Sequence, residues 1–127
     1  MTLLGFLAVG SGAAIGAWLR WWLGIVLNPL FPTLPLGTLA ANLVGGFLMG
    51  IALAVISHFE ALPAEARLMI TTGFLGGLTT FSTYSAEATT LLVRGQAGWA
   101  VAHGVVHVAG SILMTFAGAA TMRLILR

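Results

Sequence analysis

The sequence contains no cysteine, no lysine and no aspartate, and only 6% of its 127 residues are charged. Without cysteine the chain can form no disulfide, use no thiol nucleophile and build no thiolate metal site. Soluble domains average about 25% charged residues, so this chain has too little charge to cover a globular surface in water. Its solvent is therefore predicted to be lipid. The few arginines are dispersed and form no patch, so the high isoelectric point does not indicate nucleic-acid binding.

Long apolar segments separated by short connections predict four membrane-spanning helices. Each span needs about 20 residues, so four of them use most of the chain and leave no room for a soluble domain. The proline-rich connection 28–35 ends the first span, and Pro63 suits the first turn of the third. We expect one transmembrane domain over residues 1–127, with spans at residues 2–27, 36–56, 64–93 and 99–126. Four short helices seldom enclose a pore alone, so we also expect an oligomer.

The third predicted span is interrupted by the sequence GFLGGLTTFSTYS, from Gly73 to Ser85. In hydrocarbon every backbone N–H and C=O group needs a partner, so irregular backbone persists only where protein or a wet cavity covers it. The pair Gly76-Gly77 is expected to adopt backbone angles closed to other residues and to free carbonyl groups from the helix. Broken membrane helices commonly bind ions at such carbonyls. The pattern predicts an ion site at mid-membrane depth.

Small residues spaced four apart predict close approach of helix backbones. The pairs are Gly12 with Gly16, Gly46 with Gly50, and Gly73 with Gly77. Such pairs are typical of ordinary tight packing between membrane helices.

Two polar stripes share the spacing of an α-helical face. On the second span Thr38 and Asn42 lie four residues apart. For Asn42, an interhelical hydrogen bond and a place in an ion pathway are equally favoured. The fourth span carries a longer stripe of polar residues spaced four apart: His103, His107, Ser111 and Thr115. Four in a row predict a helix face that lines an ion path. For each histidine alone, a packing role is the better interpretation.

Phe81 and Tyr84 are three residues apart just after the expected break, so they project from one face of the second half-helix. Aromatic ring edges are positive, so they can meet a partly dehydrated anion, and the alternative is packing against lipid or protein. Glu87, the acid deep in a predicted span, could cap a vestibule, pair with an arginine or carry protons. Arg20 lies among tryptophans, where it either snorkels to the interface or attracts anions. No catalytic constellation accompanies these residues, so the chain is not predicted to be an enzyme.

The orientation signal is weak. Both termini and the connection after the second span share one side of the membrane, with Arg67, Arg123 and Arg127 near it. Arg20 and Arg94 lie near the other side. Three arginines against two is a small bias under the positive-inside rule. Insertion in both orientations, with opposed copies pairing about a two-fold axis, and insertion in one orientation both remain open.

Three segments resemble the Fluc, or CrcB-type, fluoride channels: GAWLRW (Gly16–Trp21), PLGTLAANLVGGFLMG (Pro35–Gly50) and GFLGGLTTFSTYSAE (Gly73–Glu87). The resemblance covers essentially the whole chain. It implies an all-α channel of the bacterial (inner) membrane that conducts fluoride passively and relieves fluoride toxicity. It also implies an antiparallel, dual-topology homodimer with two pores and one structural Na⁺ that is not transported.

The resemblance also implies roles for individual residues. The carbonyls that hold sodium fall on Gly76 and Thr79. The pore asparagine falls on Asn42, which shares its helix face with Thr38. The remaining anion-pathway positions fall on Phe81, Tyr84, Ser111, Thr115, His107 and the vestibule Arg20. Tyr84 stands where the family usually has phenylalanine, so its hydroxyl could bond the ion or hold the ring out of the pore.

Two alternative functions are compatible with the sequence. A proton-coupled exporter of fluoride or a small cation would use Glu87 and would show accumulation driven by pH. A structural helical subunit of a larger assembly would transport no ion when reconstituted alone.

Overall fold

The computed structural model describes residues 1–127 as an all-helical chain, as predicted. Four long helical segments begin and end within two residues of the expected ranges. The third segment is divided into several pieces. In chain order the elements are α1 (Leu3–Leu27), the 3₁₀ turn η1 (Asn28–Leu30), α2 (Leu36–His58), α3 (Ala64–Leu68), the π-helical turns η2 (Met69–Leu75), α4 (Gly76–Leu78), α5 (Phe81–Val93) and α6 (Ala97–Ile125).

Three helical stretches are long and apolar enough to cross a membrane: Leu3–Leu30, Leu36–His58 and Ala97–Ile125. The third predicted span is not among them because its break leaves only shorter pieces. Only 19 of the 127 residues are buried, and large apolar side chains such as Trp21 and Phe116 lie on the outside. An apolar surface of this extent is unfavourable in water, so it fits a lipid or protein surround.

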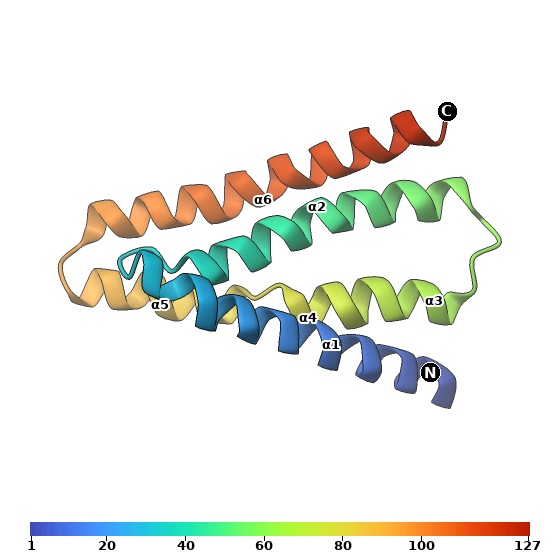
Figure 1. Cartoon of the computed structure of the whole chain (residues 1–127), viewed down its shortest axis with the longest axis horizontal. Helices are drawn as coiled ribbons and strands as arrows, with labels where there is room; N and C mark the ends of the chain where they lie inside the picture. Colours follow the sequence, from blue (N-terminus) through green and yellow to red (C-terminus); the bar gives the residue numbers. More distant parts are fainter.

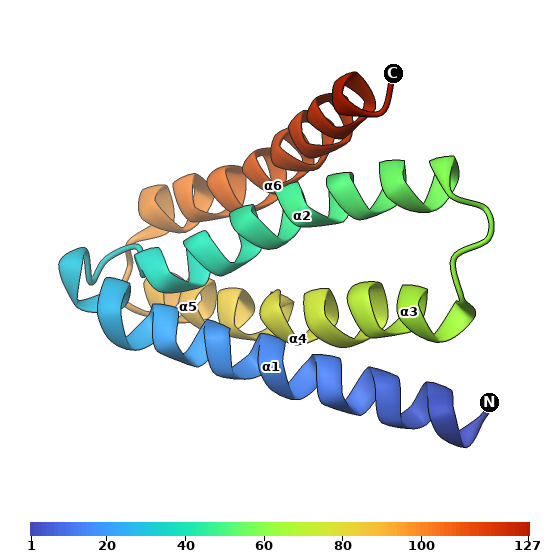
Figure 2. The same cartoon turned by 45° about the vertical axis from the view of Figure 1, so that its right-hand side comes forward.

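The four segments run alternately up and down (Figure 1). Both termini and the α2–α3 connection lie at one end, and the other two connections lie at the opposite end. Figure 2 shows α1 lying along the broken third segment, while α2 lies along α6. Near the end that carries its connection to α6, α5 also packs against α6. The broken segment is thus held between α1 on one side and α2 and α6 on the other.

Glycines permit the close contact between α1 and the third segment. A methyl group at Gly12 or Gly16 would collide with the backbone of η2 and α4, and one at Gly73 or Gly77 would collide with the backbone of α1. Gly46 and Gly50 of α2 meet the backbone of α6 in the same way. The predicted tight packing at all three glycine pairs is therefore confirmed.

The expectation that Gly76-Gly77 adopts backbone angles closed to other residues was wrong. Gly76 has φ −64° and ψ −36°, which are ordinary helical values, and both glycines belong to α4. Glycine is needed at position 77 because a side chain there would collide with the backbone of Ala13 on α1, and not because of its dihedral angles. Gly95 alone has a positive φ, 74°, where it ends α5 and turns the chain toward α6.

The packing at Gly16 can be tested against a glycine on the same helix that faces open space. Gly16→Ala places a methyl group against the backbone at Phe74 and Leu78, and overpacking of this kind costs about 1–3 kcal/mol. Gly10→Ala meets nothing within 4 Å and gains helix propensity. We expect a lower midpoint of thermal unfolding in detergent for Gly16→Ala and an equal or higher one for Gly10→Ala. Equal midpoints for wild type and Gly16→Ala would contradict the packing described.

Candidate functional site

The third segment is broken at two threonines. Thr79 (φ −81°, ψ 154°) and Thr80 (φ −151°, ψ 118°) are extended, so the helix stops at Leu78 and restarts at Phe81. The Thr80 hydroxyl accepts a hydrogen bond from the Thr83 N–H at 3.1 Å and so caps α5. The break lies inside the predicted interruption, directly after the glycines.

Asn42 on α2 supplies the partners that Thr80 loses by leaving the helix. Its Nδ2 donates to the Thr80 carbonyl at 3.0 Å, and its Oδ1 accepts from the Thr80 N–H at 2.7 Å. The same Nδ2 lies 3.0 Å from His107 Nδ1 on α6. Because Oδ1 faces a backbone donor, the amide orientation is fixed and Nδ2 must donate to His107. His107 therefore carries its proton on Nε2.

This break takes four backbone carbonyls out of the helical pattern, those of Gly76, Gly77, Leu78 and Thr79. In an unbroken helix the Gly76 carbonyl would accept from the Thr80 N–H, which instead donates to Asn42. The Thr79 carbonyl would accept from the Thr83 N–H, which instead donates to the Thr80 hydroxyl. Between them, the Gly77 carbonyl accepts from Arg20 Nε at 3.0 Å. The Gly76 and Thr79 carbonyls, to which the family resemblance assigns sodium, are among the four that the break takes out of the helical pattern.

Most of the predicted pathway residues line one open groove of about 470 Å³. No arginine, lysine or carboxylate contributes to its wall, which suits an uncharged polar path. The predicted residues that it brings together are Asn42, Gly76, Thr79, Phe81, Tyr84, His107, Ser111 and Thr115. Phe81 is 76% exposed along this groove, and its ring centroid lies 5.4 Å from that of Tyr84.

Arg20 and Thr38 do not reach this groove. They line a second cavity of about 320 Å³ together with Asn28 and Thr83. Thr80 borders both cavities. The break therefore lies between a vestibule that contains an arginine and a groove lined by amide, hydroxyl and aromatic groups.

The polar stripe on α6 is divided between two environments. His107, Ser111 and Thr115 line the groove, although His107 is only 4% exposed, whereas His103 is 0% exposed and is not part of the groove wall. The Tyr84 ring lies against both histidines, with centroids 5.1 Å and 4.8 Å away.

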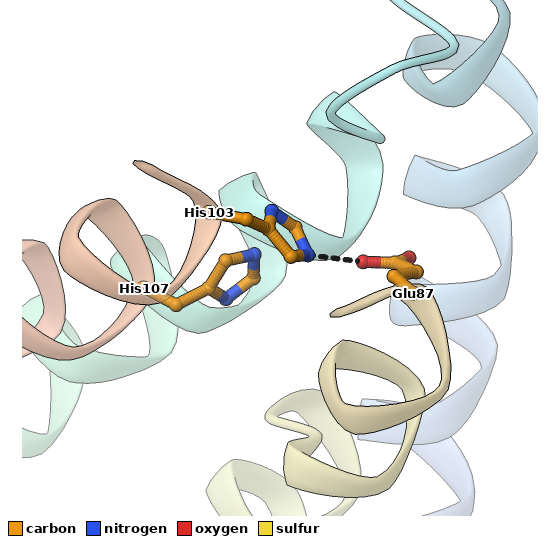
Figure 3. A group of neighbouring side chains, drawn as sticks. All are labelled: Glu87, His103 and His107. Carbon is orange, nitrogen blue, oxygen red and sulfur yellow. Dashed lines mark hydrogen bonds and ion pairs between the residues drawn. The ribbon is translucent and has the colours of Figure 1, made fainter. Parts of the chain in front are cut away.

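Glu87 pairs with a histidine and not with an arginine. His103 Nε2 lies 2.9 Å from Glu87 Oε2 (Figure 3), and the Thr38 hydroxyl donates to Glu87 Oε1 at 2.5 Å. The Glu87 side chain is 14% exposed, so these two contacts satisfy a carboxylate that is largely withdrawn from solvent.

Sequence reasoning did not single out Thr80, and it named Glu87 and His103 without placing them together. A signal existed for Thr80, since a threonine directly before a helical run is typical of an N-cap. The pairing of Glu87 with His103 had no local signal, because the two residues lie on different helices.

Comparison with known proteins places the chain in a family. Residues 7–119 match the profile described as "CrcB-like protein, Camphor Resistance (CrcB)". A relative from Nitrosospira multiformis is 59% identical over 97% of this chain and 96% of its own length. One from Aromatoleum aromaticum is 62% identical over 89% and 86%. Both relatives bear the name "Fluoride-specific ion channel FluC". The chain therefore belongs to the CrcB family.

Proposed function

We propose that this protein is a channel that conducts fluoride passively and selectively across a bacterial membrane and so reduces fluoride toxicity. The observation that carries the proposal is the identity of 59% over nearly the whole chain with a relative named as a fluoride-specific ion channel. The groove supports it, because its wall of aliphatic, aromatic, hydroxyl and amide side chains contains no carboxylate that would repel an anion. The chain is thus a conductor of ions and not an enzyme.

The anion path runs from the Arg20 vestibule past Thr80 into the groove. Arg20 and Thr38 provide positive charge and a hydroxyl at the entrance. The Phe81 and Tyr84 rings then offer their positive edges to an ion that has lost part of its water. Ser111 and Thr115 continue the polar wall along α6. In this path Asn42 holds the Thr80 backbone in place, since both of its N–H groups already have acceptors.

The functional unit is an antiparallel, dual-topology homodimer. A single chain leaves the groove open along one side and leaves Phe81 largely uncovered. The arginines are divided three to two between the ends, so neither orientation is strongly favoured. A second copy inserted the opposite way would cover the groove and bring two breaks together at mid-membrane.

The two breaks of such a dimer together bind one structural Na⁺. The Gly76 and Thr79 carbonyls of both chains provide four hard oxygen ligands, and hard cations prefer oxygen. The fit rests on the observation that the helical donors of these carbonyls are engaged by Asn42 and Thr80. When bound, the ion supplies a buried positive charge that favours an anion nearby. It remains on the dimer axis and carries no current.

The buried contact between Glu87 and His103 favours one alternative, a proton-coupled exporter. The two functions differ in their thermodynamics. A channel moves fluoride down its electrochemical gradient, whereas an exporter couples each ion to a fixed number of protons.

Purified protein in liposomes loaded with fluoride or chloride distinguishes these functions. We expect fluoride efflux and essentially no chloride efflux, with a reversal potential that follows the fluoride gradient alone. A pH gradient should not move that potential. A fixed ratio of protons to fluoride ions transported would contradict the channel and support the exporter. Absence of efflux of both fluoride and chloride would indicate a structural subunit.

Replacement of Asn42 tests the role of its amide. Asn42→Leu leaves the Thr80 N–H and C=O without partners, at a cost of about 1–3 kcal/mol for each group. We expect fluoride flux to fall by about tenfold or more, while size-exclusion chromatography still shows an assembled protein. Val44→Leu, a lipid-facing change on the same helix, is the matched control and should conduct normally. Near-normal flux through Asn42→Leu would reduce Asn42 to a packing residue.

A further inference from the structure

Three side chains that can bind a metal converge between α5 and α6 (Figure 3). His103 and His107 are four residues apart on α6, so both rings leave the helix on one face. Glu87 approaches them from α5. One ligand atom from each of the three residues lies within 4.8 Å of the other two.

Two nitrogens of this cluster are buried without a hydrogen-bond partner, His103 Nδ1 and His107 Nε2. Buried polar atoms nearly always have a partner, so each such atom needs an explanation. The two rings lie 4.4 Å apart between centroids and nearly perpendicular, at 74°. Figure 3 shows His107 beside His103 on the side away from its contact with Glu87. The cluster therefore has unused ligating capacity in a site closed to bulk water.

We infer that Glu87, His103 and His107 form a binding site for one divalent transition-metal ion of the Zn²⁺ class. Two imidazoles spaced four apart on a helix plus one carboxylate are a common ligand set for zinc, and they leave a fourth position open. Mg²⁺ and Ca²⁺ take about six or more oxygen ligands, whereas this site offers two imidazole nitrogens and a single carboxylate. Zinc bonds of about 2.1 Å place tetrahedral ligands about 3.4 Å apart, so the farthest atoms need to close by about 1.4 Å.

The surroundings provide an outer shell and an entry route. Thr38 donates to the Glu87 carboxylate at 2.5 Å and orients it. A cavity of about 210 Å³ near the α5–α6 connection is lined by Glu87, Arg94 and Gln96, so an ion can reach the carboxylate from that end of the bundle.

Metal binding competes with two existing contacts. A metal held between Glu87 and His103 Nε2 replaces their direct contact of 2.9 Å. Ligation through His107 Nε2 moves the ring proton to Nδ1, which lies 3.0 Å from the Asn42 amide nitrogen. Two donors would then face each other, so Asn42 must release His107 when the metal binds. Zinc occupancy is thereby coupled to the side chain that holds the helix break.

Calorimetric titration of the purified full-length protein with Zn²⁺, prepared without a histidine tag, tests the site. We expect one ion per chain in wild type. His103→Gln and Glu87→Gln each remove a ligand and should weaken binding by more than the roughly tenfold to 100-fold that loss of an outer-shell partner costs. His58→Gln removes an exposed histidine at the end of α2, outside the cluster, and should leave the affinity unchanged. Binding that is absent in wild type, or that survives His103→Gln undiminished, would overturn the inference.

Cobalt provides a readout that does not depend on the variants folding. Co²⁺ bound to wild type by two imidazoles and a carboxylate should give the intense visible absorption of a four-coordinate ion. Zn²⁺ should displace it. A weak, six-coordinate spectrum like that of aqueous Co²⁺ would show that the cluster does not ligate the metal.

The effect on transport rests on the proposed fluoride conduction, whereas binding itself does not. Saturating Zn²⁺ should slow fluoride efflux through wild type, because the metal displaces Asn42 from His107 beside the groove, and a chelator should restore it. Undiminished efflux at a zinc concentration that saturates the calorimetric site would contradict the coupling and leave the fluoride channel standing. Absence of fluoride efflux without zinc would contradict the channel, and calorimetry would still decide the metal site.

Discussion

The hydrogen bonds between the Asn42 side chain and the Thr80 backbone are the interaction on which the site depends. In a membrane interior, two unpaired backbone groups would favour closing the helix, since no water replaces the missing bonds. Asn42 satisfies both groups from a different helix and so makes the break stable. The same amide fixes the tautomer of His107, and its engagement of the Thr80 N–H frees the Gly76 carbonyl from the helical pattern.

Close packing of α1 makes the break rigid from the other side. Gly16 and Gly77 allow the two backbones to touch, and this brings Arg20 to within 3.0 Å of the Gly77 carbonyl. The guanidinium thereby satisfies another backbone group near the break while it also lines the vestibule. Arg20 therefore supports the break structurally, and in the proposed path the same guanidinium attracts the anion.

The number of helices and their ends were predictable from local features, because apolar runs and prolines act within their own segment. The convergence of Asn42, Phe81, Tyr84 and Ser111 on one groove followed from family resemblance. The position of the break could not be read locally. It depends on Asn42, which lies 38 residues away, so the sequence located the interruption at residues 73–85 without fixing the break at Thr79 and Thr80. The contact between Glu87 and His103 likewise arises from the packing of α5 on α6.

The proposed role of the Gly76 and Thr79 carbonyls is to hold a cation, so sodium dependence is the most direct measurement. Fluoride efflux should be recorded from proteoliposomes in which a large organic cation replaces sodium on both sides. Efflux is expected to fall to the level of protein-free vesicles and to return when sodium is restored. Full fluoride efflux in rigorously sodium-free buffer, with no metal bound to the protein, would contradict a cation site at Gly76 and Thr79.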